Sequence, residues 1–153
     1  MIREFEKLTE QEAELLFKAP FLVCILIAGA DGTIDKKEIK GAISIAEKKH
    51  KKVGIMAPYF KELAQDFEDK LKIMIQSYPY ESTQRSPLII AELSELSKLW
   101  TKLPKEFSTE FYATLLDIAQ GIASSSGGML GIRSVDAEEA KYLQLNMIQK
   151  PGI

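Results

Sequence analysis

Three carboxylates lie close together at one bend of the sequence: Asp31, Asp35 and Glu38 surround an Asp-Gly pair that follows an apolar run. Carboxylate oxygens, backbone carbonyls and water are the ligands that Mg²⁺ and Ca²⁺ prefer. An aspartate at a helix C-terminus also meets the negative end of the helix dipole, at a cost of roughly 0.3 to 1 kcal/mol that a cation would offset. The spacing predicts a site for a divalent metal ion at these three residues.

The bend does not fit a calmodulin-type calcium loop. Asp31, Gly32 and Glu38 match positions 5, 6 and 12 of an EF-hand loop. Positions 1 and 3 would then be Ile27 and Gly29, which have no side-chain oxygen.

The same residues also have an interpretation without a metal. Asp31 can form an Asx-turn and Gly32 can end a helix. Asp35 can be the N-cap of the next helix, with Glu38 as its capping-box partner. Both interpretations remain open at this stage.

A second candidate region is the loop rich in serine and glycine that we expect over residues 124–134. Its backbone amides could hold an anion, although no Gly-Lys-Ser/Thr follows to complete a phosphate loop. The glycines could equally permit a tight turn, and the apolar Met129 could contact a partner protein. The loop and partner candidates are Ser126, Gly127, Gly128, Met129, Asp136 and Glu139.

Other reactive residue types give weaker signals. The basic run 48–52 has no interleaved aromatic residue for base stacking, so nucleic-acid binding is not expected. His50 is the one histidine, which excludes a histidine-rich zinc cluster. The one cysteine, Cys24, lies in an apolar run, which indicates a buried thiol in a reducing compartment and favours the cytoplasm.

Length and composition indicate one soluble domain over residues 1–153. With 46% hydrophobic residues and a net charge of −2, the chain can bury a core but does not attract nucleic acid or an anionic membrane as a whole. The apolar run 19–30 is shorter than the roughly 20 residues of a membrane-spanning helix. A signal peptide is not expected, because the residues before the run are net acidic.

Helices are expected in the first third of the chain. Thr9 and Glu12 form a capping box, and the helix that they start should reach about Lys18, because Pro20 disfavours helical geometry. After a kink or break, a buried segment follows over 21–30, and a third helix runs from Asp35 to about His50.

The rest of the chain also reads as helix. Apolar residues at steps of three and four predict one amphipathic helix over 56–78 and another from about Ser86 to Leu103. Pro104 starts a further helix, and the last runs over 136–149. The apolar stripe after Pro104 contains Phe107, Phe111, Leu115, Ile118 and Ile122. The prediction is an all-α bundle of about seven helices.

Two short segments echo each other: TIDKKEI at 33–39 and SVDAEEA at 134–140. Each follows an apolar helix, so the bundle could contain two duplicated helix-loop-helix units. A chance likeness between two capped helices would give the same pattern.

These residues resemble the tellurite-resistance TerB-like family of small all-helical proteins. The likeness rests on LFKAPFLVCILIAGADGTIDKKEI, LWTKLP and IASSSGGMLGIRSVDAEEAKYL, which follow in order along about half of the chain. It implies a duplicated helical fold, a part in tellurite or other stress responses, and a metal at the acidic residues near the Asp-Gly turn. The matching positions are Asp31, Gly32, Asp35, Glu38, Gly127, Gly128, Gly131, Asp136 and Glu139.

The predicted function is therefore non-enzymatic, through ion binding or contact with another protein. The alternatives are a metal-free adaptor that uses the Met129 loop and a metal-assisted hydrolase. Against the hydrolase, no nucleophile with a base is evident in the sequence.

Overall fold

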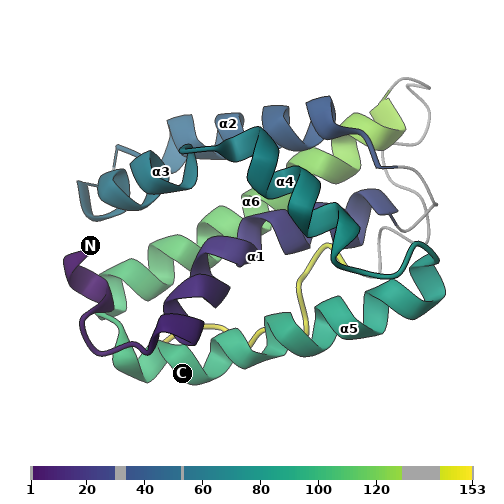
Figure 1. Cartoon of the computed structure of the whole chain (residues 1–153). Coiled ribbons are helices and arrows are strands. Elements are labelled where there is room, and N and C mark those ends of the chain that lie inside the picture. Colours follow the sequence, from purple (N-terminus) through teal and green to yellow (C-terminus); the bar gives the residue numbers. More distant parts are fainter. Residues whose placement is uncertain (1, 30–33, 53, 129–141, 153) are drawn as a thin grey trace.

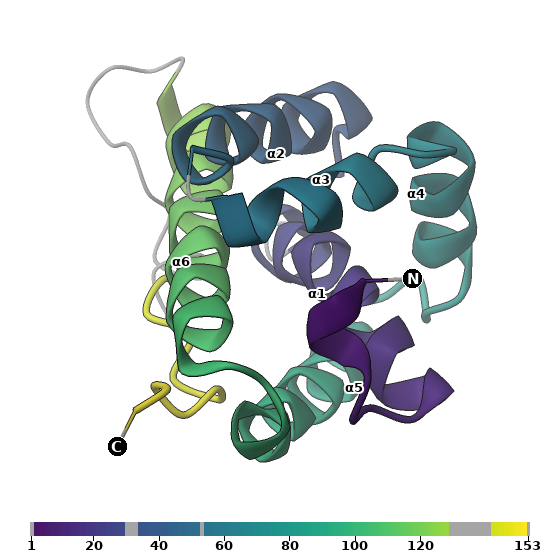
Figure 2. The ribbon, with the colours of Figure 1, turned by 90° about the vertical axis from the view of Figure 1, so that its left-hand side faces the viewer.

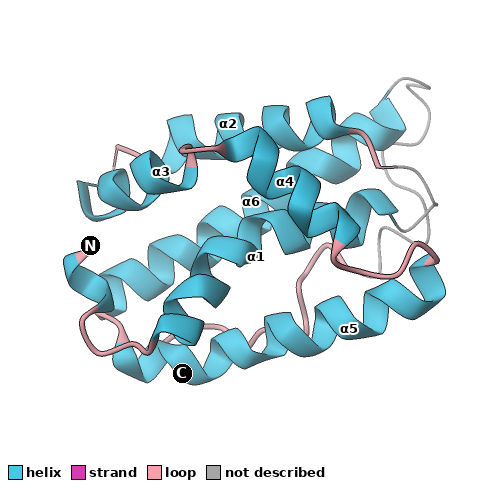
Figure 3. Cartoon of the chain, viewed as in Figure 1, coloured by secondary structure: helices cyan, strands magenta, loops and turns pink. Residues whose placement is uncertain are grey.

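Helices account for the secondary structure in the computed structural model, which describes residues 2–29, 34–52, 54–128 and 142–152 (Figure 3). Over these residues no strand occurs, so the all-α prediction is confirmed; they form six α-helices and three 3₁₀ helices. The α-helices are α1 (Glu10–Ala28), α2 (Lys36–His50), α3 (Ala57–Leu63), α4 (Phe67–Gln76), α5 (Ser82–Ser94) and α6 (Lys105–Gly128). The 3₁₀ helices are η1 (Arg3–Phe5), η3 (Gly54–Met56) and η4 (Glu95–Lys102).

Helix α1 is the centre of the bundle. In the view of Figure 2, α2, α3 and α4 lie on one side of it, α5 on the opposite side, and α6 along its flank. Its C-terminal half, from Phe21 to Ala28, is buried on every face. A helix that is apolar all round must be enclosed by others, as the sequence predicted for this segment. None of the helices described is long and apolar enough to cross a membrane.

Helix α1 continues through Pro20, so a break there and a helix end near Lys18 are both wrong, whereas a kink stays a prediction. A proline has no N–H, and the carbonyl four residues earlier therefore loses its helical partner. That carbonyl belongs to Leu16, and the hydroxyl of Tyr59 in α3 donates a hydrogen bond to it at 2.7 Å. A tertiary contact replaces the bond that the proline removes.

The expected single helix over 56–78 is divided into η3, α3 and α4. Asp66 interrupts it with a left-handed backbone, φ 52° and ψ 36°. Aspartate tolerates this conformation better than most residues. The apolar spacing continues across the break, so Phe60, Leu63 and Leu71 are all buried as the pattern predicted. The next expected helix is divided as well: α5 begins at Ser82 rather than Ser86, and the 3₁₀ helix η4 continues it.

The stripe of α6 is confirmed in full, because all five of its apolar residues are buried. The helix continues to Gly128, however, where the sequence predicted a loop from Ser124. Extending an existing helix adds one hydrogen bond for each residue ordered, which offsets the weak helix propensity of serine and glycine.

The C-terminal segment is not helical over 142–149, contrary to the expected last helix. Leu145 has a left-handed backbone and is buried together with Ile148. The indole N–H of Trp100 donates to the carbonyl of Gln149 at 2.7 Å, and the Gln149 amide donates to Ser97 Oγ at 2.7 Å. Trp100 therefore anchors the chain's own C-terminal turns. The echo at 134–140 lies outside the described residues, so the duplication stays a prediction.

The Tyr59 hydroxyl should stabilise the fold because of Pro20. Tyr59→Phe leaves the buried Leu16 carbonyl without a donor, and we expect a loss of about 1 to 3 kcal/mol in the free energy of unfolding, measured by urea denaturation. In a Pro20→Ala background the loss should be smaller, because residue 20 then supplies the N–H. Equal losses in the two backgrounds would contradict this account. Tyr112→Phe, at a half-buried tyrosine of α6, is the control for loss of a hydroxyl.

Candidate functional site

The bend between α1 and α2 holds two of the three predicted metal ligands in one helical turn. Asp35 is the N-cap of α2, as predicted, and its Oδ1 accepts from the amides of Lys37 at 2.8 Å and Glu38 at 3.3 Å. Glu38 lies in the first turn of the same helix and is half-buried. Asp31 lies outside the described residues, which by themselves contain no group of three possible metal ligands. The three-residue site stays a prediction.

A buried guanidinium lies at the α1 end of this bend. Arg85 of α5 is only 5% exposed, and its Nη2 donates to the Gly29 carbonyl at 2.9 Å. Its Nη1 donates to the Tyr80 carbonyl at 2.6 Å. Burial lowers the pKa of Arg85, while the charge of Glu81 acts in the opposite direction. The cation meets the negative end of the α1 dipole and thereby helps to end the helix.

A side chain at position 29 would displace the guanidinium from this contact. A Cβ added to Gly29 would lie 2.4 Å from Arg85 Nη2. The glycine in the sequence Ala-Gly-Ala therefore gives the arginine access to the helix end. It also places a positive charge at the end of α1, two residues before Asp31 in the sequence.

The second predicted region is only partly described. Ser126, Gly127 and Gly128 lie in the last turn of α6, so the loop predicted for them is wrong. In an α-helix each amide donates to the carbonyl four residues earlier, so these amides do not form an anion-binding loop. Met129, Asp136 and Glu139 lie outside the described residues, and their predicted roles are untested.

The basic run at the end of α2 contains a feature that the sequence did not reveal. His50 turns inward and is 5% exposed. Its Nδ1 contacts Glu110 Oε2, and its Nε2 lies 2.5 Å from Asp117 Oδ2. Glu110 and Asp117 are seven residues apart on α6, about two turns, and so share one face. We call these three residues the His50 clasp.

The His50 clasp joins α2 to α6 through charge. Each ring nitrogen faces a carboxylate oxygen, so a ring that donates through both nitrogens pairs both carboxylates. Lys49 adds a cation, 3.1 Å from Asp117 Oδ2. Partial burial acts to raise the pKa of Asp117, but hydrogen bonds from His50 and Lys49 outweigh it and hold this pKa below its usual value.

The clasp is poorly suited to catalysis or metal binding. Both imidazole nitrogens are occupied, and the ring is shielded from solvent. A general base or a metal-bound histidine needs one nitrogen free for the substrate or the ion. Cys24 is equally inaccessible, since it is buried and burial strongly raises the pKa of its thiol. The two most reactive residue types, His50 and Cys24, therefore contribute to the packing of the fold.

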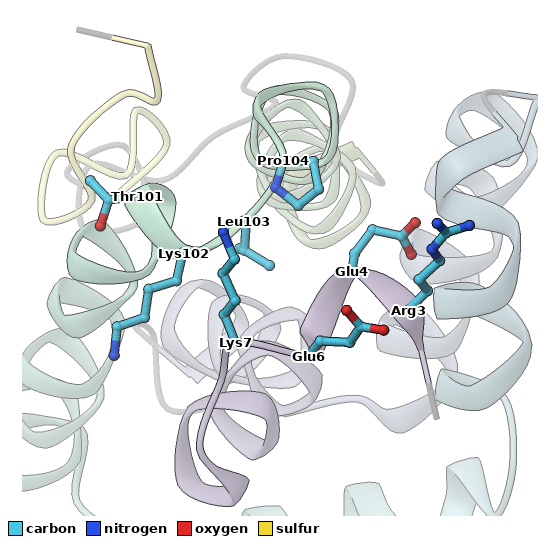
Figure 4. A pocket seen from close by; sticks show the side chains of 8 residues that line it. All are labelled: Arg3, Glu4, Glu6, Lys7, Thr101, Lys102, Leu103 and Pro104. Atoms are coloured by element: carbon cyan, nitrogen blue, oxygen red, sulfur yellow. The ribbon is translucent and has the colours of Figure 1, made fainter.

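A surface pocket of about 330 Å³ lies between the N-terminal residues 3–7 and the segment 101–104, where η4 ends before α6. Figure 4 shows its charged side chains pointing in different directions, with Arg3, Glu4 and Glu6 on one side and Lys7 and Lys102 on the other. Lys102 is engaged with Glu12 at 2.6 Å. Mixed charges that do not converge on one point give this pocket no evident chemistry.

Comparison with models of protein families, with curated proteins and with solved structures found no match to this chain. The likeness to the TerB-like family therefore remains a prediction from the motifs quoted above.

The His50 clasp should contribute measurably to stability. His50→Gln removes the cation between two carboxylates, and we expect unfolding to become easier by about 1 to 3 kcal/mol. Adding Glu110→Gln and Asp117→Asn should recover part of this loss, because no carboxylates are then left unpaired. The control Lys52→Gln, two residues further on, should change stability by less than about 0.5 kcal/mol. If the triple variant is no more stable than His50→Gln, the loss comes from packing rather than charge.

Asp117 should make the fold sensitive to acid. Its pKa is lower in the folded chain than the unperturbed value of 3.8, so its contribution is complete above about pH 3.8 and is lost as the pH falls through the folded value. Asp117→Asn should reduce this part of the acid-induced loss, measured as urea midpoints between about pH 6 and about pH 2.5. An unchanged slope in the variant would show that another carboxylate is responsible. Asp69→Asn, at an exposed aspartate of α4, is the control.

Proposed function

We propose that this chain is a non-enzymatic, cytoplasmic TerB-like domain that binds a divalent cation, Mg²⁺ or Ca²⁺, and takes part in a tellurite or general stress response. Asp31, Asp35 and Glu38 would be the ligands. One observation carries the proposal: Asp35 and Glu38 lie within one helical turn, directly after the bend at the end of α1. The start of the helix thereby places two acidic residues three positions apart.

The geometry of Asp35 suits such a role. The two amides of α2 engage its Oδ1, while its Oδ2 accepts no hydrogen bond from any described residue. The side chain is exposed and fixed, so little rotational freedom would be lost on binding. Few carboxylates and the nearby Arg85 predict a weak site, completed by backbone carbonyls and water.

The non-enzymatic part rests on what the reactive residues do. His50 uses both ring nitrogens in the clasp, and Cys24 is buried. A metal-assisted hydrolase would need neither residue, because bound water could be its nucleophile. Hydrolysis of a phosphate ester that depends on Mn²⁺ and is lost with the metal ligands would favour this alternative.

A metal-free adaptor is the second candidate, and one exposed side chain favours it. Tyr80, between α4 and α5, is 88% exposed. Tyrosine rings are common anchors at protein interfaces, so this ring is available to a partner. Its backbone carbonyl is held by Arg85, which fixes the position from which the ring projects. A Tyr80→Ser variant that loses a partner captured by the wild type would support this role.

Thermal melting with metal ions tests the main proposal. A cation that binds only the folded chain should stabilise it by about 2.7 kcal/mol at 100 times its Kd, which appears as a rise in Tm. Mg²⁺, Ca²⁺, Mn²⁺ and Zn²⁺ would each be titrated. The rise should disappear in Asp31→Asn/Glu38→Gln.

The matched control is Glu14→Gln/Glu62→Gln, which removes the same charge from two exposed glutamates away from the bend. It should keep the metal response. Absence of a response to all four ions in the wild type, or equal responses in the two double variants, would overturn metal binding at this site. The former result would leave the adaptor as the better candidate.

A further inference from the structure

A second pocket, of about 310 Å³, lies between the first turns of α2 and of α4. Figures 1 and 2 show these two helices at the same side of the bundle, and Lys40 and Glu68 join them across the pocket at 3.4 Å. We call it the lysine pocket. Its lining residues are Lys36, Lys37, Lys40, Phe67, Glu68, Asp69, Leu71 and Lys72.

The lysine pocket has a positive charge in a molecule that is negative overall. Four lysines face two carboxylates there, whereas the whole chain has a net charge of −2. Lys40 is the one lysine of the four with an ion pair within the described residues, and that pair is long and exposed. Such a pair contributes little, so among the residues that line the pocket two ammonium groups are in excess over the carboxylates.

Two helix dipoles add to this charge. Lys36 and Lys37 are the first residues of α2, and 67–69 are the first residues of α4. The N-terminus of a helix behaves as a partial positive charge and presents free amides, although in α2 the amides of Lys37 and Glu38 already donate to Asp35. The N-cap of α4, Asp66, accepts no hydrogen bond with its side chain, so α4 lacks the side-chain cap that α2 has.

The floor of the pocket is apolar and held in place. Leu71 is buried, and the half-buried ring of Phe67 packs on Phe21 of α1 with centroids 5.2 Å apart. An organic group could lie on this floor, while the acids Glu68 and Asp69 could accept hydrogen bonds from hydroxyl groups. The pocket thus combines a cationic rim, apolar contact area and two acceptors.

We propose that the lysine pocket binds a phosphate monoester through its phosphate group. A dianion matches the excess of two positive charges, which a single carboxylate would only half neutralise, and lysine is a common phosphate ligand. The phosphate lies at the lysines and the two helix starts, and the organic part lies against Phe67. A soluble metabolite and a lipid headgroup both offer this chemistry.

Calorimetric titration with AMP tests the proposal, with adenosine and inorganic phosphate as companion ligands. EDTA is present, so that no divalent cation bridges the phosphate to the acidic bend. AMP should bind and adenosine should not. Amide shifts on adding AMP, followed by NMR, should concentrate at 36–40 and 67–72. Shifts spread over other basic surfaces would contradict the assignment.

Two variants that remove the same charge at different places distinguish binding in the lysine pocket from general attraction of AMP to a positive surface. Lys36→Gln/Lys72→Gln should weaken AMP binding about tenfold, because two ammonium contacts are lost. Lys48→Gln/Lys52→Gln removes the same charge at the other end of α2 and should weaken it less than about twofold. Equal losses in the two variants would overturn the proposal.

Vesicles of phosphatidylcholine with phosphatidic acid identify the source of the phosphate. Sedimentation with these vesicles that depends on Lys36 and Lys72, without AMP binding, would assign the pocket to a lipid headgroup. Binding of neither AMP nor the vesicles would overturn the proposal. Because EDTA excludes divalent cations, AMP binding is measured with the metal site empty, so failure of this proposal can be distinguished from failure of metal binding.

Discussion

The fold depends on enclosing a helix that has no polar face. From Phe21 to Ala28, α1 offers no side for water, so helices must cover it all round. Enclosure then raises a second requirement, since buried backbone groups must keep hydrogen-bond partners. Pro20 leaves one carbonyl of α1 without its helical donor, and the helix end leaves more. Tyr59 from α3 donates to the first of these carbonyls, and Arg85 from α5 donates to a carbonyl at the helix end.

The same constraint explains why polar residues inside the bundle serve the structure. Once α2 and α6 close over α1, charged groups at their contact must be paired, because an unpaired buried charge is costly. The His50 clasp meets this condition by placing one ring between two carboxylates. The inward charges are thus committed to joining helices. The binding functions proposed above are therefore at the surface, at Asp35, which caps α2, and at the lysine pocket, which residues of the start of α2 help to line.

Local rules predicted local structure well. The capping box of Thr9 and the N-cap Asp35 were readable because cap and partner are three residues apart. The stripe of α6 was readable because its period is that of a helix.

Errors arose where a distant residue decides the outcome. Pro20 stays helical because of Tyr59, whereas the left-handed Asp66 breaks a helix without disturbing its apolar spacing. Over 142–149 the apolar residues reach the core through turns, so hydrophobicity alone could not distinguish a helix from a turn. In the clasp, His50 contacts Glu110 and Asp117, which lie 60 and 67 positions later in the sequence. The only local sign of it is the spacing of seven residues between the two acids.

The start of α2 brings opposite charges into one short segment, and this placement links the two proposed sites. Asp35 and Glu38 belong to the bend, whereas Lys36, Lys37 and Lys40 line the lysine pocket. Without an anion, these ammonium groups would lower the affinity of the proposed cation site. A phosphate in the pocket would cancel part of their field, and the fields of charges a few ångströms apart are only partly screened by salt. Because coupling between two sites is reciprocal, a cation at the bend would strengthen phosphate binding to the same degree. One helical start could in this way make the occupancy of each site depend on that of the other, without any change in the fold.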